Sequence, residues 1–193
     1  MDILDLLTNQ LGNENVLKEL SKTANADPSQ IQKAVSLGVP ALLESLVRNA
    51  KTEEGALSLA KALDSHKDDK VDDIEGFLKN VDMEDGPKIL GHILGGNKQK
   101  VQKNLAAQTG LQDNQVQDIL KQLAPLLLGS LGKQKTSKNV GSDGLQNMLA
   151  GVLAGQASKN NGIMDSVTKL LDADDDGSIV DDVGKMLGEF FKK

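Results

Sequence analysis

The residues best placed for chemistry are the aspartates of an acidic segment near the end of the chain, residues 172–182. Three aspartates alternate there and a glycine follows them, as at the first, third, fifth and sixth places of an EF-hand calcium loop. Because Ca²⁺ takes oxygen ligands from flexible loops, this pattern predicts a calcium site. The predicted ligands are Asp172, Asp174, Asp176, the backbone carbonyl of Ser178, and Asp182.

The segment departs from the EF-hand pattern at its twelfth place, where Val183 stands instead of a bidentate acid. A shortened loop closed by Asp182 would bind calcium weakly. The alternative interpretation is an acidic turn whose carboxylates cap the following helix and complement its dipole. The sequence leaves both interpretations open.

Residues that commonly carry out catalysis are few. The chain has two histidines, His66 and His92, one arginine, Arg48, and no cysteine. His66 is predicted to lie in a polar linker and His92 on an apolar helix, where histidine usually has a structural role. The sequence contains no phosphate-binding loop, nucleophile motif or zinc-helix motif. It therefore favours a non-enzymatic protein that interacts with other proteins; the alternative is a hydrolase or transferase with an unrecognised site.

The composition predicts an all-α, multi-helix bundle. Only three of the 193 residues are aromatic, all of them phenylalanine. A core without Trp or Tyr must be filled by smaller apolar side chains, which recur here at helical spacing. The alternation that is typical of strands is missing. Without cysteine, disulfides and thiolate metal ligands are excluded.

Charge and hydropathy limit the partners and the location. Residues 1–85 have a net charge of -8, residues 86–138 of +6, and residues 139–193 of -4. The lysine-rich middle part lacks the arginines and aromatic residues that bind nucleic acids, so no nucleic-acid partner is expected. An unknown protein partner or self-association is predicted instead. No apolar segment reaches the ~20 residues of an integral membrane segment, and the acidic start does not resemble a signal peptide, so a cytoplasmic location is expected.

An internal repeat organises the chain. Shifted by 85 residues, the segment 16–46 aligns with 101–131 without a gap, and ten positions are identical, including Pro40 and Pro125. The matched apolar positions follow helical spacing, so the buried face of a helix is what is repeated. We predict that residues 13–51 and 98–136 adopt the same arrangement of three helices, in which each proline breaks or kinks a helix.

Local signals place the helices. Asn13, Asp27 and Asn97 are expected to cap helix starts, a helix is expected to begin at Thr52, and a polar connector is expected over residues 133–141. The predicted organisation is a first helical unit over 1–65, a linker and short helix over 66–85, a second helical unit over 86–138, and C-terminal helices with the acidic loop over 139–193.

The two proline-centred units, above all residues 109–111 and 123–132, together with the Asp-rich tail, resemble the bacterial family of unknown function numbered 937, the YidB-like proteins. The resemblance covers most of the chain and implies a small helical protein, often with an acidic loop at its end. It implies no established activity, so no catalytic residue can be transferred from the family.

Overall fold

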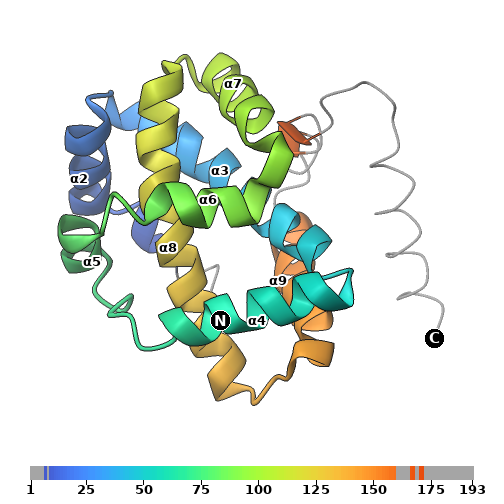
Figure 1. Cartoon of the computed structure of the whole chain (residues 1–193). Helices are drawn as coiled ribbons and strands as arrows, with labels where there is room; N and C mark the ends of the chain where they lie inside the picture. Colours follow the sequence, from blue (N-terminus) through green and yellow to red (C-terminus); the bar gives the residue numbers. More distant parts are fainter. Residues whose placement is uncertain (1–6, 8, 160–165, 168–169, 172–193) are drawn as a thin grey trace.

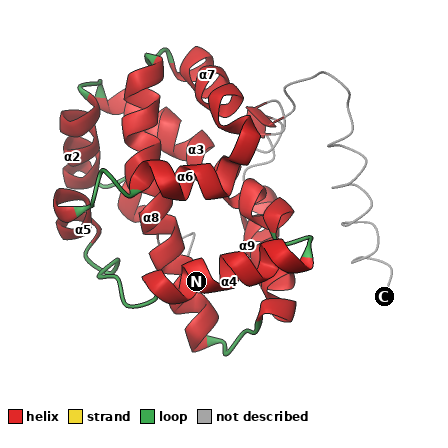
Figure 2. Cartoon of the chain, in the orientation of Figure 1, coloured by secondary structure: helices red, strands yellow, loops and turns green. Residues whose placement is uncertain are grey.

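The computed structural model of the chain describes residues 7, 9–159, 166–167 and 170–171, and this part is a bundle of helices (Figure 1). Every regular element in it is helical, and Figure 2 shows no strand among the described residues. The all-α prediction is confirmed. The helices are α2 (Glu14–Ala24), α3 (Pro28–Asn49), α4 (Glu53–His66), α5 (Ile74–Asn80), α6 (Gly86–Leu94), α7 (Lys98–Thr109), α8 (Asp113–Ser137) and α9 (Ser142–Lys159), and a 3₁₀ turn, η1 (Gly95–Asn97), precedes α7.

Side-chain caps determine where several helices begin. The Asn13 side chain accepts a hydrogen bond from the backbone N–H of Asn15 at 3.0 Å, and Thr52 Oγ1 accepts one from the N–H of Gly55 at 3.1 Å. Each bond satisfies an N–H group that has no partner within its own helix. The helix starts predicted at Asn13 and Thr52 are confirmed. α3 and α7 also begin directly after the predicted caps Asp27 and Asn97, but neither of these two side chains makes a capping bond, so that part of the prediction is wrong.

An offset of 85 residues relates the helix pair α2–α3 to the pair α7–α8. The first residues of α3 and α8, Pro28 and Asp113, differ by this offset. So do Asn25 and Gly110, which end α2 and α7 in the left-handed region with φ of 48° and 74°. Glycine, and less often asparagine, adopts this conformation at helix ends. The repeat therefore includes the helix boundaries as well as the buried residues.

The two prolines stand inside long helices and do not end them. Pro40 lies within α3 and Pro125 within α8, at the same distance from the start of each helix. The prediction of three helices per copy is therefore wrong at this point: the structure has two. A proline in a helix interior costs about 3 kcal/mol, but both belong to continuously buried segments, residues 38–47 and 122–132. Burial of these largely apolar segments outweighs the lost hydrogen bond.

Helix α6 approaches α8 where Pro125 interrupts the hydrogen bonds of α8. Proline has no N–H, so the carbonyl of Lys121 loses its usual donor four residues later. Gly86, the first residue of α6, lies against this turn, and a β-carbon added to it would be 2.8 Å from the Lys121 carbonyl oxygen. Glycine permits this approach because it has no side chain. The contact positions α6, which forms one side of the site described below.

Two glutamines make reciprocal bonds between the repeated helix pairs. Gln30 Nε2 donates to the carbonyl of Gly110 at 2.9 Å, and Gln115 Nε2 donates to the carbonyl of Asn25 at 2.6 Å. The two donors are equivalent under the 85-residue offset, and so are the two acceptors. Each long helix therefore holds the end of the other pair's short helix, as in an interface with two-fold symmetry.

The helices that follow the long helices are also exchanged between the pairs. α4 comes directly after α3 but packs mainly on α8, whereas α9 comes after α8 and packs on α3. α8 runs through the middle of the bundle, and α6 and α4 cross it (Figure 1). A single apolar cluster, from Leu7 to Leu171, fills the interior of the described part.

The segment 133–141 is mostly helical and is not the polar connector that the sequence predicted. α8 continues to Ser137, so only residues 138–141 join it to α9. Gly132 brings this end of α8 close to α4: a β-carbon added to it would overlap the carbonyl oxygen of Leu63. Tertiary packing therefore extends the helix beyond the point where its composition becomes polar.

Ion pairs connect the acidic first part of the sequence to its lysine-rich middle part. Lys133 pairs with Asp72, and Lys135 Nζ lies 2.7 Å from Asp64 Oδ1. Parts of the sequence with opposite net charge thus attract each other within one chain. Because both aspartates are exposed, such pairs contribute about 0–1 kcal/mol each.

The residues between α4 and α5 lie against α8. Val71 is buried, and a β-carbon added to Gly129 of α8 would be 2.7 Å from Val71 Cγ1. The predicted linker therefore contacts the second helical unit. The division into residues 1–65, 66–85, 86–138 and 139–193 stays a prediction.

Candidate functional site

A cleft of about 560 Å³ lies between the end of α3, α4 and α6, and we call it the α4–α6 cleft. Its volume is in the range of sites that hold a small molecule. The only arginine and both histidines of the chain line it. Its polar lining includes Arg48, Asn49, Ser58, Ser65, His66, Asp85, Lys88 and His92.

The apolar wall of the cleft comes from four helices. Apart from the partly buried Ala62, it consists of side chains that belong to the core, and none of these is more than 7% exposed. An apolar group that entered the cleft would be removed from water against this wall, which contributes about 25 cal/mol per Å² of apolar area buried. The core residues of the wall are Leu46, Leu59, Ile89, Ile93 and Leu128.

Asn49 fixes the sides of the cleft relative to each other. Its Nδ2 donates to the backbone carbonyls of His92 at 2.9 Å and Ile93 at 3.0 Å, near the end of α6. These carbonyls are among the last of a helix, which lack partners within it. On the other side, a β-carbon added to Gly55 would overlap the Asn49 carbonyl oxygen. The end of α3, the start of α4 and the end of α6 therefore meet at this residue.

Arg48 lies at the end of α3 with one edge of its guanidinium group turned to a carboxylate. Its Nε is 3.4 Å from Glu44 Oε1, one helical turn earlier, which is a long contact. The Glu44 side chain is 9% exposed and the Arg48 side chain 32%. Among the described residues, the two terminal amino groups of Arg48 make no hydrogen bond. They are the donors that bind carboxylates and phosphates in pairs.

His66 ends α4 and is oriented by an aspartate. Its Nδ1 lies 2.8 Å from Asp69 Oδ2 in the turn that follows. In the neutral ring, this bond places the proton on Nδ1 and leaves Nε2 as an acceptor. The His66 ring is 21% exposed, so the interaction is partly shielded from water.

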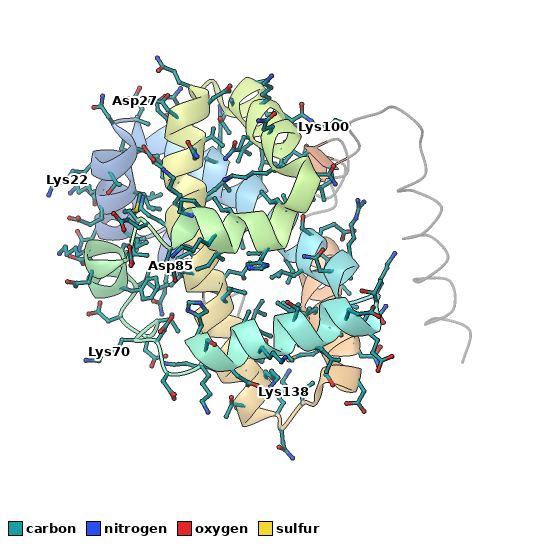
Figure 3. All side chains as sticks on the ribbon, in the orientation of Figure 1. Lys22, Asp27, Lys70, Asp85, Lys100 and Lys138 are labelled. Carbon is teal, nitrogen blue, oxygen red and sulfur yellow. The ribbon has the colours of Figure 1, made fainter. Side chains whose placement is uncertain are left out.

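Helix α6 contributes the remaining ionisable groups of the cleft. Lys88 Nζ is 3.1 Å from Asp85 Oδ1, and both side chains are largely exposed. Asp85 lies at the start of α6, and Lys100 of α7 lies beyond the other end of α6 (Figure 3). The His92 ring has no hydrogen-bond partner within the part of the chain that the structure describes. The unpaired polar groups of the cleft therefore include the Arg48 terminal amino groups and the His92 ring.

The chemistry available in the cleft is that of binding an anion with an apolar portion. Nowhere in the described part of the chain do three His, Cys, Asp or Glu side chains come together in a way that could hold a metal ion. Ser65 Oγ donates to the carbonyl of Lys61 at 3.0 Å, and no described serine hydroxyl is hydrogen-bonded to His66. A hydrogen-bonded pair of serine nucleophile and histidine base is therefore not formed there among the described residues.

The sequence did not indicate this cleft. Arg48, His66 and His92 are separated by up to 44 residues, and each stands beside unremarkable helical residues. The only signal in the sequence was that these residue types are rare: the chain has one arginine and two histidines. All three of them line this cleft. The predicted calcium ligands Asp172, Asp174, Asp176, Ser178 and Asp182 lie outside the described residues.

By its fold, the described part of the chain is an all-helical bundle protein with a repeated helix pair. The chain belongs to the family described as "Bacterial protein of unknown function (DUF937)", and the match covers residues 5–134. The family resemblance predicted from the sequence is confirmed. No curated protein and no solved structure matches the chain. None of the described helices has the length and apolar character needed to cross a membrane; the cytoplasmic location stays a prediction.

Proposed function

We propose that this protein is a non-enzymatic binding module and that a segment of a partner polypeptide enters the α4–α6 cleft. The observation that supports this proposal is the gathering of Arg48, His66 and His92 around an apolar wall. Elsewhere on the described surface, Leu57 is the one large apolar side chain that is exposed. This part of the surface therefore does not favour a broad apolar docking face. It favours a cleft that takes in a short segment.

A hydrolase or transferase is the second candidate, and the His66–Asp69 pair favours it. An Asp-oriented histidine facing a cleft is an arrangement found for general bases. Binding is the better supported function because the cleft offers this histidine no partnered nucleophile among the described residues. Turnover of a substrate by the wild type that is lost in His66→Gln would favour the enzyme instead.

Filling the cleft is expected to abolish partner binding. Ser58 is exposed on α4 and lines the cleft, so Ser58→Trp would occupy the space without disturbing the core. In pull-downs from the native organism, quantified by mass spectrometry, the variant should retain less than about a tenth of the wild-type partner, the level expected when a central contact is lost.

Gln99→Trp is the matched control, since Gln99 is exposed on α7 and does not line the cleft. It should capture the partner as the wild type does, and thermal unfolding should show that both variants are folded. Equal capture by all three proteins would reject the cleft as the binding site. If the captured polypeptide is the protein itself, the binding is self-association.

We also propose that the acidic segment binds one calcium ion through Asp172, Asp174, Asp176, the Ser178 carbonyl and Asp182. Alternating carboxylates followed by glycine support this, because closely spaced acids repel one another unless a cation neutralises them. Since Val183 stands at the twelfth place, we expect a Kd of about 10⁻⁴ M or weaker.

Calorimetric titration with calcium tests this site. The wild type should release or absorb heat with a one-to-one stoichiometry, and Asp174→Ala should not. Calcium at 100 times its Kd should stabilise any fold coupled to the loop by ~2.7 kcal/mol. Asp68→Ala removes an exposed aspartate elsewhere and should titrate like the wild type. Absence of binding by the wild type at millimolar calcium would reduce the segment to an acidic helix cap.

A further inference from the structure

We infer that the α4–α6 cleft recognises the free C-terminal carboxylate of a polypeptide whose last residues are apolar. This inference rests on the proposed binding function and specifies the chemistry of its ligand. Three features of the cleft support it: the available donors of Arg48, the balance of charges around the cleft, and the Ser58 hydroxyl beside the apolar wall.

Arg48 is the group that would bind the carboxylate. The contact to buried Glu44 uses Nε and leaves the two terminal amino groups as a pair of donors. Two parallel N–H···O bonds from such a pair match the two oxygens of a carboxylate. Lys88 cannot supply this geometry, because an ammonium group is a point charge and already has Asp85 as a partner.

The charge around the cleft favours a monoanion over a dianion. Glu44 and Asp85 balance Arg48 and Lys88, so these four groups have a formal charge of zero, counting both histidines as neutral. A carboxylate would share the Arg48 guanidinium group with Glu44 and add one negative charge. A phosphate group would add close to two negative charges.

The polar lining favours a peptide over an alkyl chain. The Ser58 hydroxyl lies beside the apolar wall and has no hydrogen-bond partner among the described residues, whereas Ser65 and Thr52 are already bonded to the backbone of α4. A hydrocarbon chain would cover the Ser58 hydroxyl without offering it a hydrogen bond, which is unfavourable. A peptide offers it an amide group and places its apolar side chains against Leu59 and Ile89.

The binding of two labelled peptides to the full-length protein tests this inference. They are fluorescein-Ala-Leu-Leu with a free C-terminus and the same peptide as its C-terminal amide. Decanoate and the unlabelled free-acid peptide serve as competitors. We expect the free acid to bind about 10 to 100 times more tightly than the amide, which is the usual effect of losing a charged hydrogen-bond pair. Decanoate should compete more weakly than the unlabelled free-acid peptide.

Substitutions at Arg48 connect the preference to this residue. The double variant Glu44→Gln, Arg48→Gln avoids leaving a buried unpaired carboxylate, and it should bind acid and amide equally. Arg48→Lys keeps the charge without the planar donor pair and should lose most of the preference. Lys100→Gln changes an exposed lysine of α7 outside the cleft and should retain the full preference.

The inference is overturned if the acid and the amide bind equally to the wild type, if neither binds, or if the Arg48 variants keep the preference. Competition by decanoate equal to that of the peptide would overturn the polypeptide as the source of the carboxylate. The proposed function fails separately, since it depends on whether Ser58→Trp removes the native partner. If Ser58→Trp loses the partner but the wild type shows no preference for a free C-terminus, the cleft remains the proposed binding site and a C-terminal carboxylate is rejected as its ligand.

Discussion

Replacing Leu120 by alanine is expected to lower the free energy of unfolding by about 3–5 kcal/mol. Leu120 is fully buried on α8, and its Cδ2 would lie 3.3 Å from a β-carbon built on Gly38 of α3. The two long helices therefore cross tightly here, and the backbone cannot move in to fill the space that a smaller side chain would leave. Chemical denaturation with urea measures the change.

Leu57→Ala is the matched control for this substitution. Leu57 is 46% exposed on α4, so the same change in side chain removes little buried area. Its effect should stay within about 0.5 kcal/mol. If the two variants lose the same stability, the crossing of α3 and α8 is not the packed centre that the structure describes.

Gly132→Ala is expected to destabilise the protein by about 1–3 kcal/mol, although alanine is the better helix former. The added β-carbon would overlap the Leu63 carbonyl oxygen and lie 3.1 Å from Lys67 N. Both obstacles are backbone atoms of α4 and the turn after it, so α4 itself would have to move away from α8. Thermal and urea unfolding monitored by circular dichroism measure the loss.

Gly91→Ala separates this steric effect from helix propensity. Gly91 lies inside α6, and an added β-carbon would meet nothing within 4 Å. This variant should gain about 0.5–1 kcal/mol, because alanine loses less conformational entropy than glycine in a helix. Stabilisation by both substitutions would contradict the close approach of α4 to α8.

The helical content and many helix starts could be predicted because local rules determine them. Asn13 and Thr52 cap helices through bonds to residues two or three positions later, which is a property of the adjacent sequence. The 85-residue repeat was visible for the same reason, since each copy keeps the buried face of its helices.

The errors arose where tertiary packing overrides a local preference. Pro40 and Pro125 would end an isolated helix, but the segments around them are buried on all sides, so each helix continues. The polar residues after Gly132 resemble a connector, yet contacts with α4 and the partners of Lys133 and Lys135 keep them helical. Neither effect can be computed from neighbours in the sequence.

The cleft was not predictable from spacing because three separate contacts assemble it. Gly86 brings α6 to α8, Asn49 holds the end of α6, and Gly55 admits the start of α4. In the sequence, each of these three residues looks like an ordinary helix boundary. The gathering of Arg48 and the histidines depends on all three contacts together.

The exchange of helices has a consequence for how the chain is made. During translation, α2, α3 and α4 leave the ribosome first, but the helices that cover them, α8 for α4 and α9 for α3, are encoded later. The first half must therefore keep leucine-rich surfaces exposed to water until about residue 159 has emerged. Such surfaces are prone to aggregation and are typical targets of chaperones. The bundle is thus expected to fold late in synthesis, as one unit, and not in two successive halves.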